Sequence, residues 1–243
     1  MFLRCISSFF CILLCLIPAQ GWAAIAFDAA SGNTKASGGG NSITVAHTAT
    51  GTGTDGLLLA LCGINTGGGT SFTGMTWNGT ALTQLETLIN SSTLRTDIWY
   101  LKAPAAGSFN MVASTDNDLA TTCHVLTLTG VDQTTTFGTE VPGTGSNSAP
   151  SVTVTTASGE LVVDIVAWNV GSGQTPGANQ TQRDSARSSG SGITTAISTQ
   201  AGADGGVMSW TQNGAVAWIQ IAVPVKAAAS AVTCRMMLMG VGC

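Results

Sequence analysis

The stretch Leu57–Asn65 reads LLLALCGIN, an apolar run that begins directly after Gly56. A strand with one face in solvent alternates apolar and polar residues, whereas a strand covered on both faces is apolar throughout. This run therefore predicts a central β-strand with both faces covered. A similar run, LVVDIVAWN, returns at Leu161–Asn169, which indicates that the chain contains the same strand twice.

Three other segments also occur twice, in the same order and with shorter loops in the second copy. The pairs are Ser42–Val45 with Ser151–Val154, Gly107–Met111 with Gly206–Trp210, and Ala120–Leu128 with Ala215–Val223. Ordered repetition indicates an internal duplication, with copies at about 25–137 and 150–226 joined by the Gly/Ser/Pro-rich connector Gly138–Pro150. The alternative is that Thr-rich strands resemble one another by chance.

Short strand signals separated by turn signals recur throughout residues 25–226, and no segment there has a helical period. One hairpin is explicit, because Asn78-Gly79, between Met75–Trp77 and Thr80–Leu82, suits the positive φ angles of a type I′ turn. We predict an all-β fold: an antiparallel two-sheet β-sandwich of the jelly-roll or concanavalin type with an internal duplication.

Both ends of the chain differ from its middle. Residues 1–24 combine Arg4, an apolar stretch and small residues before Ala24, which is the layout of a secretory signal peptide. Residues 227–243 form a linker and an apolar, Cys-containing tail that is too short to span a bilayer. We expect a secreted or cell-surface protein with no stable membrane span after cleavage; a retained N-terminal anchor is the alternative. The tail is either a docking or sorting peptide or a frayed terminus.

Charged residues make up 8% of the chain, against about a quarter in typical globular domains. Acidic residues outnumber basic ones, and the sequence contains no basic patch for a phosphate backbone, so we expect no nucleic-acid partner. Low charge also weakens the repulsion between copies of the chain, which favours self-association.

Removal of the signal peptide leaves Cys62, Cys123, Cys234 and Cys243 as disulfide candidates. Export makes disulfides possible, although the sequence does not decide among the pairings. Cys62 and Cys123 each lie in a predicted strand and would form a bridge if those strands are neighbours; two buried free thiols are the alternative. The other two cysteines lie apart, in the tail.

The last strand of the domain offers a candidate binding face. Alternation along Val216–Val225 turns Trp218 and Gln220 to one face and places the opposite face in the core, with Ile219, Ile221, Val223 and Val225. Trp168 lies on the matching strand of the same copy. Exposed Trp rings stack on sugar rings, so Trp168, Trp218 and Gln220 are candidate ligand-binding residues for a glycan. The alternative is that loops or the second sheet cover this face.

The sequence contains no recognisable catalytic centre. Glycan cleavage needs two nearby carboxylates, but the glutamates lie far apart, which leaves aspartates such as Asp97 and Asp164. Asp164 interrupts an apolar strand, and we expect its face to lie partly in solvent. Serine hydrolase chemistry needs a base, yet there is no Gly-x-Ser-x-Gly motif. We expect His124 in the core beside Leu126 and His47 at a polar strand end, and we predict no enzyme.

One turn is a candidate metal site. Asp116 and Asp118 lie in the oxygen-rich turn Asp116-Asn117-Asp118 and could bind calcium, which takes about six to eight oxygen ligands. Aspartate and asparagine are also ordinary turn formers. Zinc is disfavoured because no spacing of cysteine and histidine matches a zinc motif, and we expect no other cofactor.

Several strand and turn segments carry a resemblance to known modules. They are Ile25–Gly32, Trp77–Thr83, Ile98–Leu101, Pro104–Gly107 and Leu128–Val131. Together they resemble a class of uncharacterised β-sandwich, jelly-roll-like modules of secreted bacterial proteins and phage structural proteins. The resemblance implies a scaffold with an interaction role at a cell surface or on a virion, and it brings no catalytic residues.

These observations favour a secreted, non-enzymatic surface or structural protein that binds glycans or acts as an adhesin. The first alternative is a self-assembling subunit of a virion or filament, whose partners are other copies of itself. The second alternative is a polysaccharide hydrolase or lyase.

Overall fold

The computed structural model describes residues 24–65, 69–90, 93–170, 173–189 and 192–229. Strands form nearly all of the regular structure in these ranges, and their one helical element is the short 3-10 turn η1 (Gly202–Asp204). The predicted signal peptide up to residue 23 lies outside the described residues, and so does the end of the tail with Cys234 and Cys243. Within the described ranges, no helix is both long enough and apolar enough to cross a membrane.

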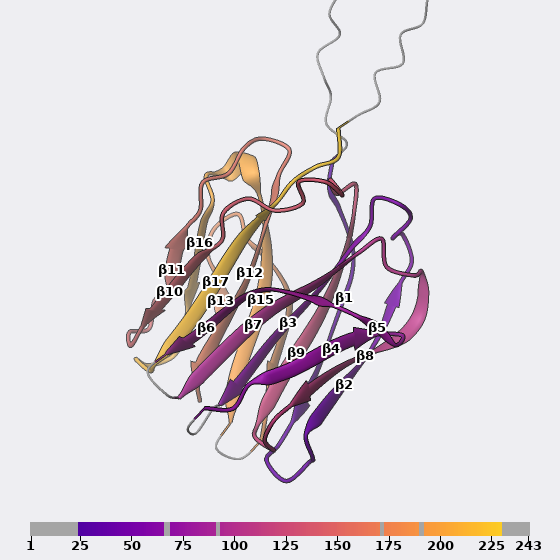
Figure 1. The fold of residues 1–243 in the computed structure, drawn as a ribbon. Coiled ribbons are helices and arrows are strands. Elements are labelled where there is room, and N and C mark those ends of the chain that lie inside the picture. Colours follow the sequence, from indigo (N-terminus) through magenta and orange to yellow (C-terminus); the bar gives the residue numbers. More distant parts are fainter. Residues whose placement is uncertain (1–23, 66–68, 91–92, 171–172, 190–191, 230–243) are drawn as a thin grey trace, which may run out of the picture.

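The first half of the chain forms two antiparallel sheets (Figure 1). The five-stranded sheet has the spatial order β1 (Ala26–Lys35), β9 (Thr121–Thr129), β3 (Leu57–Asn65), β7 (Leu94–Lys102) and β6 (Thr83–Asn90). The four-stranded sheet has the order β2 (Ser42–Ala49), β8 (Gly107–Thr115), β4 (Phe72–Trp77) and β5 (Thr80–Ala81).

The second half also forms two antiparallel sheets. The five-stranded sheet has the order β10 (Val141–Gly145), β17 (Trp218–Val225), β12 (Leu161–Asn169), β15 (Ile193–Ala201) and β14 (Thr181–Arg187). The three-stranded sheet has the order β11 (Ser151–Thr153), β16 (Val207–Thr211) and β13 (Thr175–Pro176).

The two halves repeat one topology. When β3 is matched with β12 and β9 with β17, the strand order of each sheet is the same in both halves, apart from β5, which has no counterpart in the described residues. An irregularity is repeated as well: β6 has a bulge between Gln84 and Glu86, and β14 has one between Gln182 and Asp184. The predicted duplication is therefore confirmed at the level of topology.

The pairing register corrects one detail of the internal alignment. Leu57 of β3 pairs with Leu128 of β9, and Leu161 of β12 pairs with Val225 of β17. Leu128 therefore corresponds to Val225 and not to Val223. Because side chains alternate with period two, this shift of two residues leaves the predicted core face unchanged.

Each half is a sandwich by itself, and the two sandwiches meet through their five-stranded sheets. The buried cluster between these sheets includes Leu59 and Leu126 of the first half and Ile165 and Ile221 of the second. Other clusters lie between the two sheets of each half. The β-sandwich class is therefore confirmed, but the described residues form four stacked sheets (Figure 1) where the sequence predicted two.

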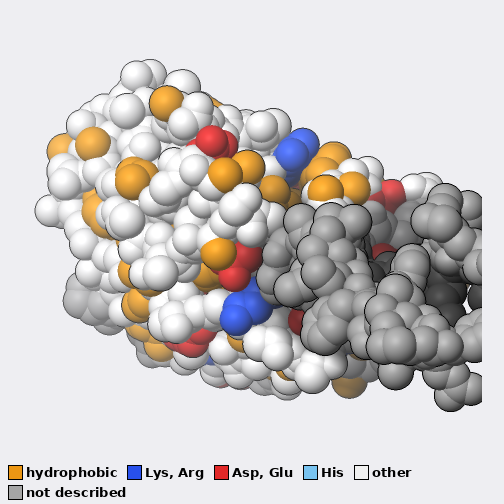
Figure 2. Space-filling view, turned by 90° about the horizontal axis from the view of Figure 1, so that it is seen from above, with side chains coloured by type: hydrophobic (Ala, Val, Ile, Leu, Met, Phe, Trp, Pro, Cys, Tyr) orange, Lys and Arg blue, Asp and Glu red, His pale blue; other side chains and the backbone are white. Residues whose placement is uncertain are grey.

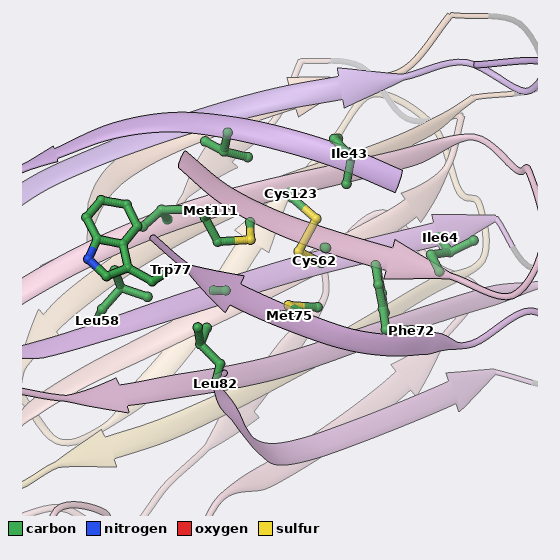
Figure 3. Packing of buried hydrophobic residues seen from close by; sticks show 14 of the residues in the cluster. Ile43, Leu58, Cys62, Ile64, Phe72, Met75, Trp77, Leu82, Met111 and Cys123 are labelled. Atoms are coloured by element: carbon green, nitrogen blue, oxygen red, sulfur yellow. A yellow bond between two sulfur atoms is a disulfide. The ribbon is translucent and has the colours of Figure 1, made fainter. Parts of the chain in front are cut away.

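Burial on both faces explains the composition of β3. Leu57, Leu59 and Leu61 pack against the second sandwich, and Leu58 and the even-numbered residues after it pack against the four-stranded sheet of their own half (Figure 3). The prediction of a strand covered on both faces is confirmed. The predicted Cys62–Cys123 disulfide is present in the buried cluster between the two sheets of the first half.

Strands β6, β10 and β14, which were not predicted from the sequence, lie at the edges of the five-stranded sheets. Their side chains are mostly exposed or half-buried, so they lack the apolar pattern on which strand prediction rests. The polar stretch 174–191 contains β14, and the predicted connector Gly138–Pro150 contains β10.

Candidate functional site

The four-stranded sheet of the first half has one face in the core and one in solvent. Side chains alternate strictly between exposed and buried positions along β2, and β8 follows a similar alternation. Hydroxyl and amide side chains occupy outward positions on both strands, among them Thr48, Ser108 and Asn110.

An open groove of about 690 Å³ lies on this outer face and extends onto β1. Its polar lining includes Ser31, Thr48, Thr76, Asn78, Ser108 and Asn110, and its apolar lining includes Ala29, Ala46, Phe109 and Val112. None of the described residues that line the groove is Asp, Glu, Lys or Arg. The groove therefore presents uncharged hydrogen-bonding groups beside small apolar surfaces.

Local contacts hold the walls of the groove. The backbone N–H of Asn78 donates to the carbonyl oxygen of Asn110 at 3.2 Å, and the hydroxyls of Thr48 and Ser108 lie 2.8 Å apart. Asn78 (φ 48°) and Gly79 (φ 80°) form the tight turn between β4 and β5. Asparagine and glycine tolerate this left-handed conformation, and the predicted hairpin is confirmed.

Aromatic rings pack beneath the groove. Trp77 meets Phe109 edge-on, with ring centroids 5.5 Å apart, and it meets His47 with centroids 5.8 Å apart. Trp77 belongs to the buried cluster between the two sheets (Figure 3). The floor of the groove thus rests on a packed core.

His47 is enclosed at the edge of the groove, and both of its ring nitrogens contact hydroxyl groups. Nδ1 lies 3.0 Å from Oγ of Ser31, and Nε2 lies 3.1 Å from Oγ1 of Thr127. Thr127 in turn donates to Oδ2 of Asp28 at 2.8 Å. A continuous chain of hydrogen bonds therefore joins a groove residue to a carboxylate. The predicted polar setting of His47 is confirmed, but the residue lies within β2 and not at its end.

The surroundings of His47 and Asp28 determine their ionisation. Burial lowers the pKa of His47, and the Asp28 carboxylate opposes this effect only in part. Burial would raise the pKa of Asp28, but hydrogen bonds from Thr50, Thr127 and the backbone together hold it below its usual value. Near neutral pH, His47 is therefore neutral and Asp28 is ionised.

The structure places Trp168, Trp218 and Gln220 in the interior, so the predicted exposed binding face is wrong. Trp168 and Gln220 are fully buried, and Trp218 is 5% exposed. These residues face the three-stranded sheet β11–β16–β13, where Trp168 packs edge-on against Trp210 at 6.0 Å between centroids. The second sheet of this half covers the face, as the alternative interpretation held.

Asp164 is also fully buried, which contradicts its expected partial exposure. Its carboxylate accepts hydrogen bonds from Ser198, Trp210 and Gln220. Burial raises the pKa of Asp164 to about 6, although these hydrogen bonds act in the opposite direction. Asp164 and Trp168 lie on the same face of β12, so the three-stranded sheet of the second half covers both side chains.

The structure does not bring Asp97 and Asp164 together. Asp97 lies in the first half on β7, where Arg95 donates to it with two nitrogens at 2.6 and 2.9 Å. Gln84 and Thr87 also donate to this carboxylate. Each aspartate is therefore held by its own donors in its own sandwich, and the two do not form a catalytic pair.

His124 joins the two sandwiches. Its Nδ1 lies 2.8 Å from Oδ2 of Asp184, and its Nε2 lies 2.8 Å from Oγ1 of Thr195, both in the second half. Burial would raise the pKa of Asp184, but the hydrogen bond and the electrostatic attraction of His124 lower it. His124 is thus confirmed as a buried core histidine with hydrogen-bond partners.

The carboxylates of Asp116 and Asp118 bind donors of the chain itself. Asp116 accepts from the N–H and the hydroxyl of Ser71 at 3.0 and 2.8 Å. Asp118 accepts from Lys35 Nζ at 2.7 Å and from the N–H of Gly40 at 2.8 Å. These hydrogen bonds lower the pKa of both aspartates.

No cluster of three or more His, Cys, Asp or Glu in the described ranges could hold a metal. Calcium binding at this turn stays a prediction.

Ser31, Thr127 and Asp28 could not be connected with His47 from the sequence. These residues lie on β1 and β9 of one sheet, and His47 lies on β2 of the other. No spacing motif links them, because only the folded edge of the sandwich brings the three strands together. For the groove itself, the alternation along β8 is the signal that could have identified exposed Asn110.

No family model, curated protein or solved structure matches this chain. The geometry of the groove and of the hydrogen-bond chain beside it is therefore the basis for the function.

Proposed function

We propose that this protein is a secreted surface protein that binds neutral glycans in the groove on the outer face of β2, β8 and β4. The observation that carries the proposal is the lining of the groove, where hydroxyl and amide side chains and His47 lie beside apolar ones such as Phe109. The described lining includes no Asp, Glu, Lys or Arg. Sugar hydroxyls both donate and accept hydrogen bonds, and the amides of Asn78 and Asn110 offer both roles. The Cys62–Cys123 disulfide supports export, since such bonds persist in oxidising compartments.

Other ligand classes fit the groove less well. Nucleic acids need lysine or arginine against their phosphates, and the lining contains neither. Charged side chains are also scattered, without a continuous basic patch, on the face that Figure 2 shows. A small apolar ligand favours an enclosed and mainly apolar pocket. An extended neutral polysaccharide suits both the open shape and the uncharged lining.

Binding to a panel of immobilised neutral polysaccharides tests this proposal, with Asn110→Ala as the groove variant. Asn110 is exposed on β8, so its truncation leaves the core intact. Thr44→Ala is the matched control, because Thr44 is exposed on β2 but does not line the groove. We expect Asn110→Ala to weaken binding by roughly tenfold, the effect of one or two net hydrogen bonds, and Thr44→Ala to bind like the wild type. Failure of every polysaccharide to bind, or equal affinity of all three proteins, would reject the proposal.

A further inference from the structure

The hydrogen bonds around His47 determine where each proton in the chain lies. An ionised carboxylate only accepts, so the Thr127 hydroxyl gives its one hydrogen to Oδ2 of Asp28, 2.8 Å away. Thr127 can then only accept from Nε2 of His47, at 3.1 Å, which means that Nε2 carries a proton. In a neutral imidazole, Nδ1 is then unprotonated and accepts from the Ser31 hydroxyl at 3.0 Å.

The position of Ser31 makes this hydroxyl accessible. Ser31 is half-buried and lines the groove, whereas His47 is 3% exposed and Thr127 is fully buried. The base is thus almost fully enclosed at the border of the groove, and the hydroxyl that donates to it lies at the groove. This is the relationship of a nucleophile to its general base, with the base oriented by a third group.

Other candidates lack this combination. Nδ1 of His124 meets the carboxylate of Asp184, and its Nε2 meets the buried hydroxyl of Thr195. Within the groove, Ser108 pairs with Thr48 and not with a base. Ser31 therefore differs from the other groove hydroxyls whose partners are described above, because it contacts an imidazole nitrogen.

We infer that Ser31 is an activated nucleophile that cleaves acyl esters, with His47 as its general base and Thr127 and Asp28 as positioning residues. Acyl transfer follows from the serine–imidazole pair, and esters are the acyl compounds that we assign to it. The further statement that the ester is an acyl group carried by a glycan in the groove rests on the proposed function. The inference extends that function from binding to deacylation.

The reaction needs water as its only co-reactant. Ser31 Oγ attacks the ester carbonyl carbon, and the hydroxyl proton passes to Nδ1 of His47. The bond between the acyl carbon and the sugar oxygen breaks, and that oxygen takes the proton from His47, which leaves the acyl group on Ser31. A water molecule then gives a proton to His47 and attacks the acyl carbon, so that a carboxylic acid leaves and Ser31 regains its proton. The Asp28 carboxylate, through Thr127, favours the transient imidazolium.

A fluorophosphonate probe tests the inference on the full chain, because it reacts with activated serines and does not need glycan binding. We expect mass spectrometry to find the adduct on Ser31 and to find none at this position in Ser31→Ala. His47→Gln should slow the labelling by at least roughly a hundredfold. Ser42→Ala, which removes an exposed serine of β2 that does not line the groove, should leave the labelling of Ser31 at the wild-type rate. Hydrolysis of p-nitrophenyl acetate by the same proteins gives a second readout.

Three results would overturn the inference: no adduct on wild-type Ser31, an adduct confined to other serines, or an unchanged labelling rate in folded His47→Gln. The position of the adduct in the wild-type protein tests the inference even where a His47 variant does not fold. Polysaccharide binding by the same wild-type sample keeps the two proposals separate. Intact binding without an adduct overturns only the nucleophile, and an adduct without binding overturns only the glycan site.

Discussion

Cys62 and Cys123 lie directly opposite each other on β3 and β9, with their Cα atoms 4.1 Å apart, and they form a disulfide. The equivalent pair in the second half is Val166 opposite Gln220. The duplicated scaffold therefore forms this strand pair without a crosslink in one of its two copies. The bridge adds stability to a pair that already has its hydrogen bonds and its packing.

We expect the double variant Cys62→Val/Cys123→Ala to fold and to lose about 2–4 kcal/mol of unfolding free energy, because an open chain gains more conformational freedom on unfolding. Urea unfolding under non-reducing conditions, followed by tryptophan fluorescence, measures this loss. Reductant should lower the stability of the wild type toward that of the variant and leave the variant unchanged. A variant as stable as the oxidised wild type would contradict this expectation.

Gly32 permits the contact between His124 and Asp184 that joins the two sandwiches. A Cβ atom at residue 32 would overlap Oδ2 of Asp184 and lie 2.8 Å from Nδ1 of His124. We expect Gly32→Ala to displace the carboxylate from the histidine and to cost about 1–3 kcal/mol, since it leaves Nδ1 of the buried His124 without its partner. Urea unfolding measures the cost.

The matched control for Gly32→Ala is Gly74→Ala. Gly74 lies in β4, and nothing lies within 4 Å of the position of its added Cβ, so this substitution should change stability little. In an Asp184→Ala background, Gly32→Ala should cost much less than in the wild type, because the group that it displaces is gone. The same cost in both backgrounds would show that the overlap with Asp184 is not the cause.

The central strands could be predicted from the sequence because a strand that is buried on both faces appears as an uninterrupted apolar run. Leu57–Asn65 has no polar alternation, and sheets cover both of its faces. The number of layers could not be predicted in this way, because an apolar face shows that it is covered but not which sheet covers it. The misplacement of Trp168 has the same origin: its face was identified, but the small sheet that covers it was not.

The candidate site was less predictable than the core. Asn110 follows from simple alternation along β8, but the chain from Ser31 to Asp28 depends on three strands that meet at one edge of the first sandwich. Polar residues at such an edge have no periodic pattern that would link Ser31 with His47. Chemistry that is assembled from distant strands becomes visible only in the folded chain.

Trp168 should matter for stability and not for glycan binding. The ring is fully buried against Trp210, so Trp168→Ala should cost about 3–5 kcal/mol through the cavity that it leaves. Trp168→Phe should cost much less, because it keeps a ring, and the indole nitrogen that it removes has no hydrogen-bond partner among the described residues. Urea unfolding and polysaccharide binding, measured on both variants, check this. Weaker binding by a fully stable Trp168 variant would restore the ring as a contact residue.

Asp164 should contribute more stability at mildly acidic pH than at neutral pH. Burial raises its pKa from 3.8 to about 6, so the folded protein holds a proton on this group at pH values where the unfolded chain has lost it. The stabilising contribution is therefore fully present below a pH of about 4, and it is lost as the pH rises through about 6.

Asp164→Asn isolates this contribution, because an amide does not titrate. We expect the unfolding free energy of the wild type minus that of Asp164→Asn to increase by on the order of 1 kcal/mol when the pH falls from about 7 to 5. Carboxylates whose pKa is lowered, such as Asp28 and Asp184, act in the opposite direction, but they are present in both proteins and cancel in the difference. Urea unfolding of both proteins across this pH range gives the measurement. A difference that stays constant or shrinks would mean that Asp164 keeps its charge in the folded state, and that its hydrogen bonds from Ser198, Trp210 and Gln220 outweigh the effect of burial.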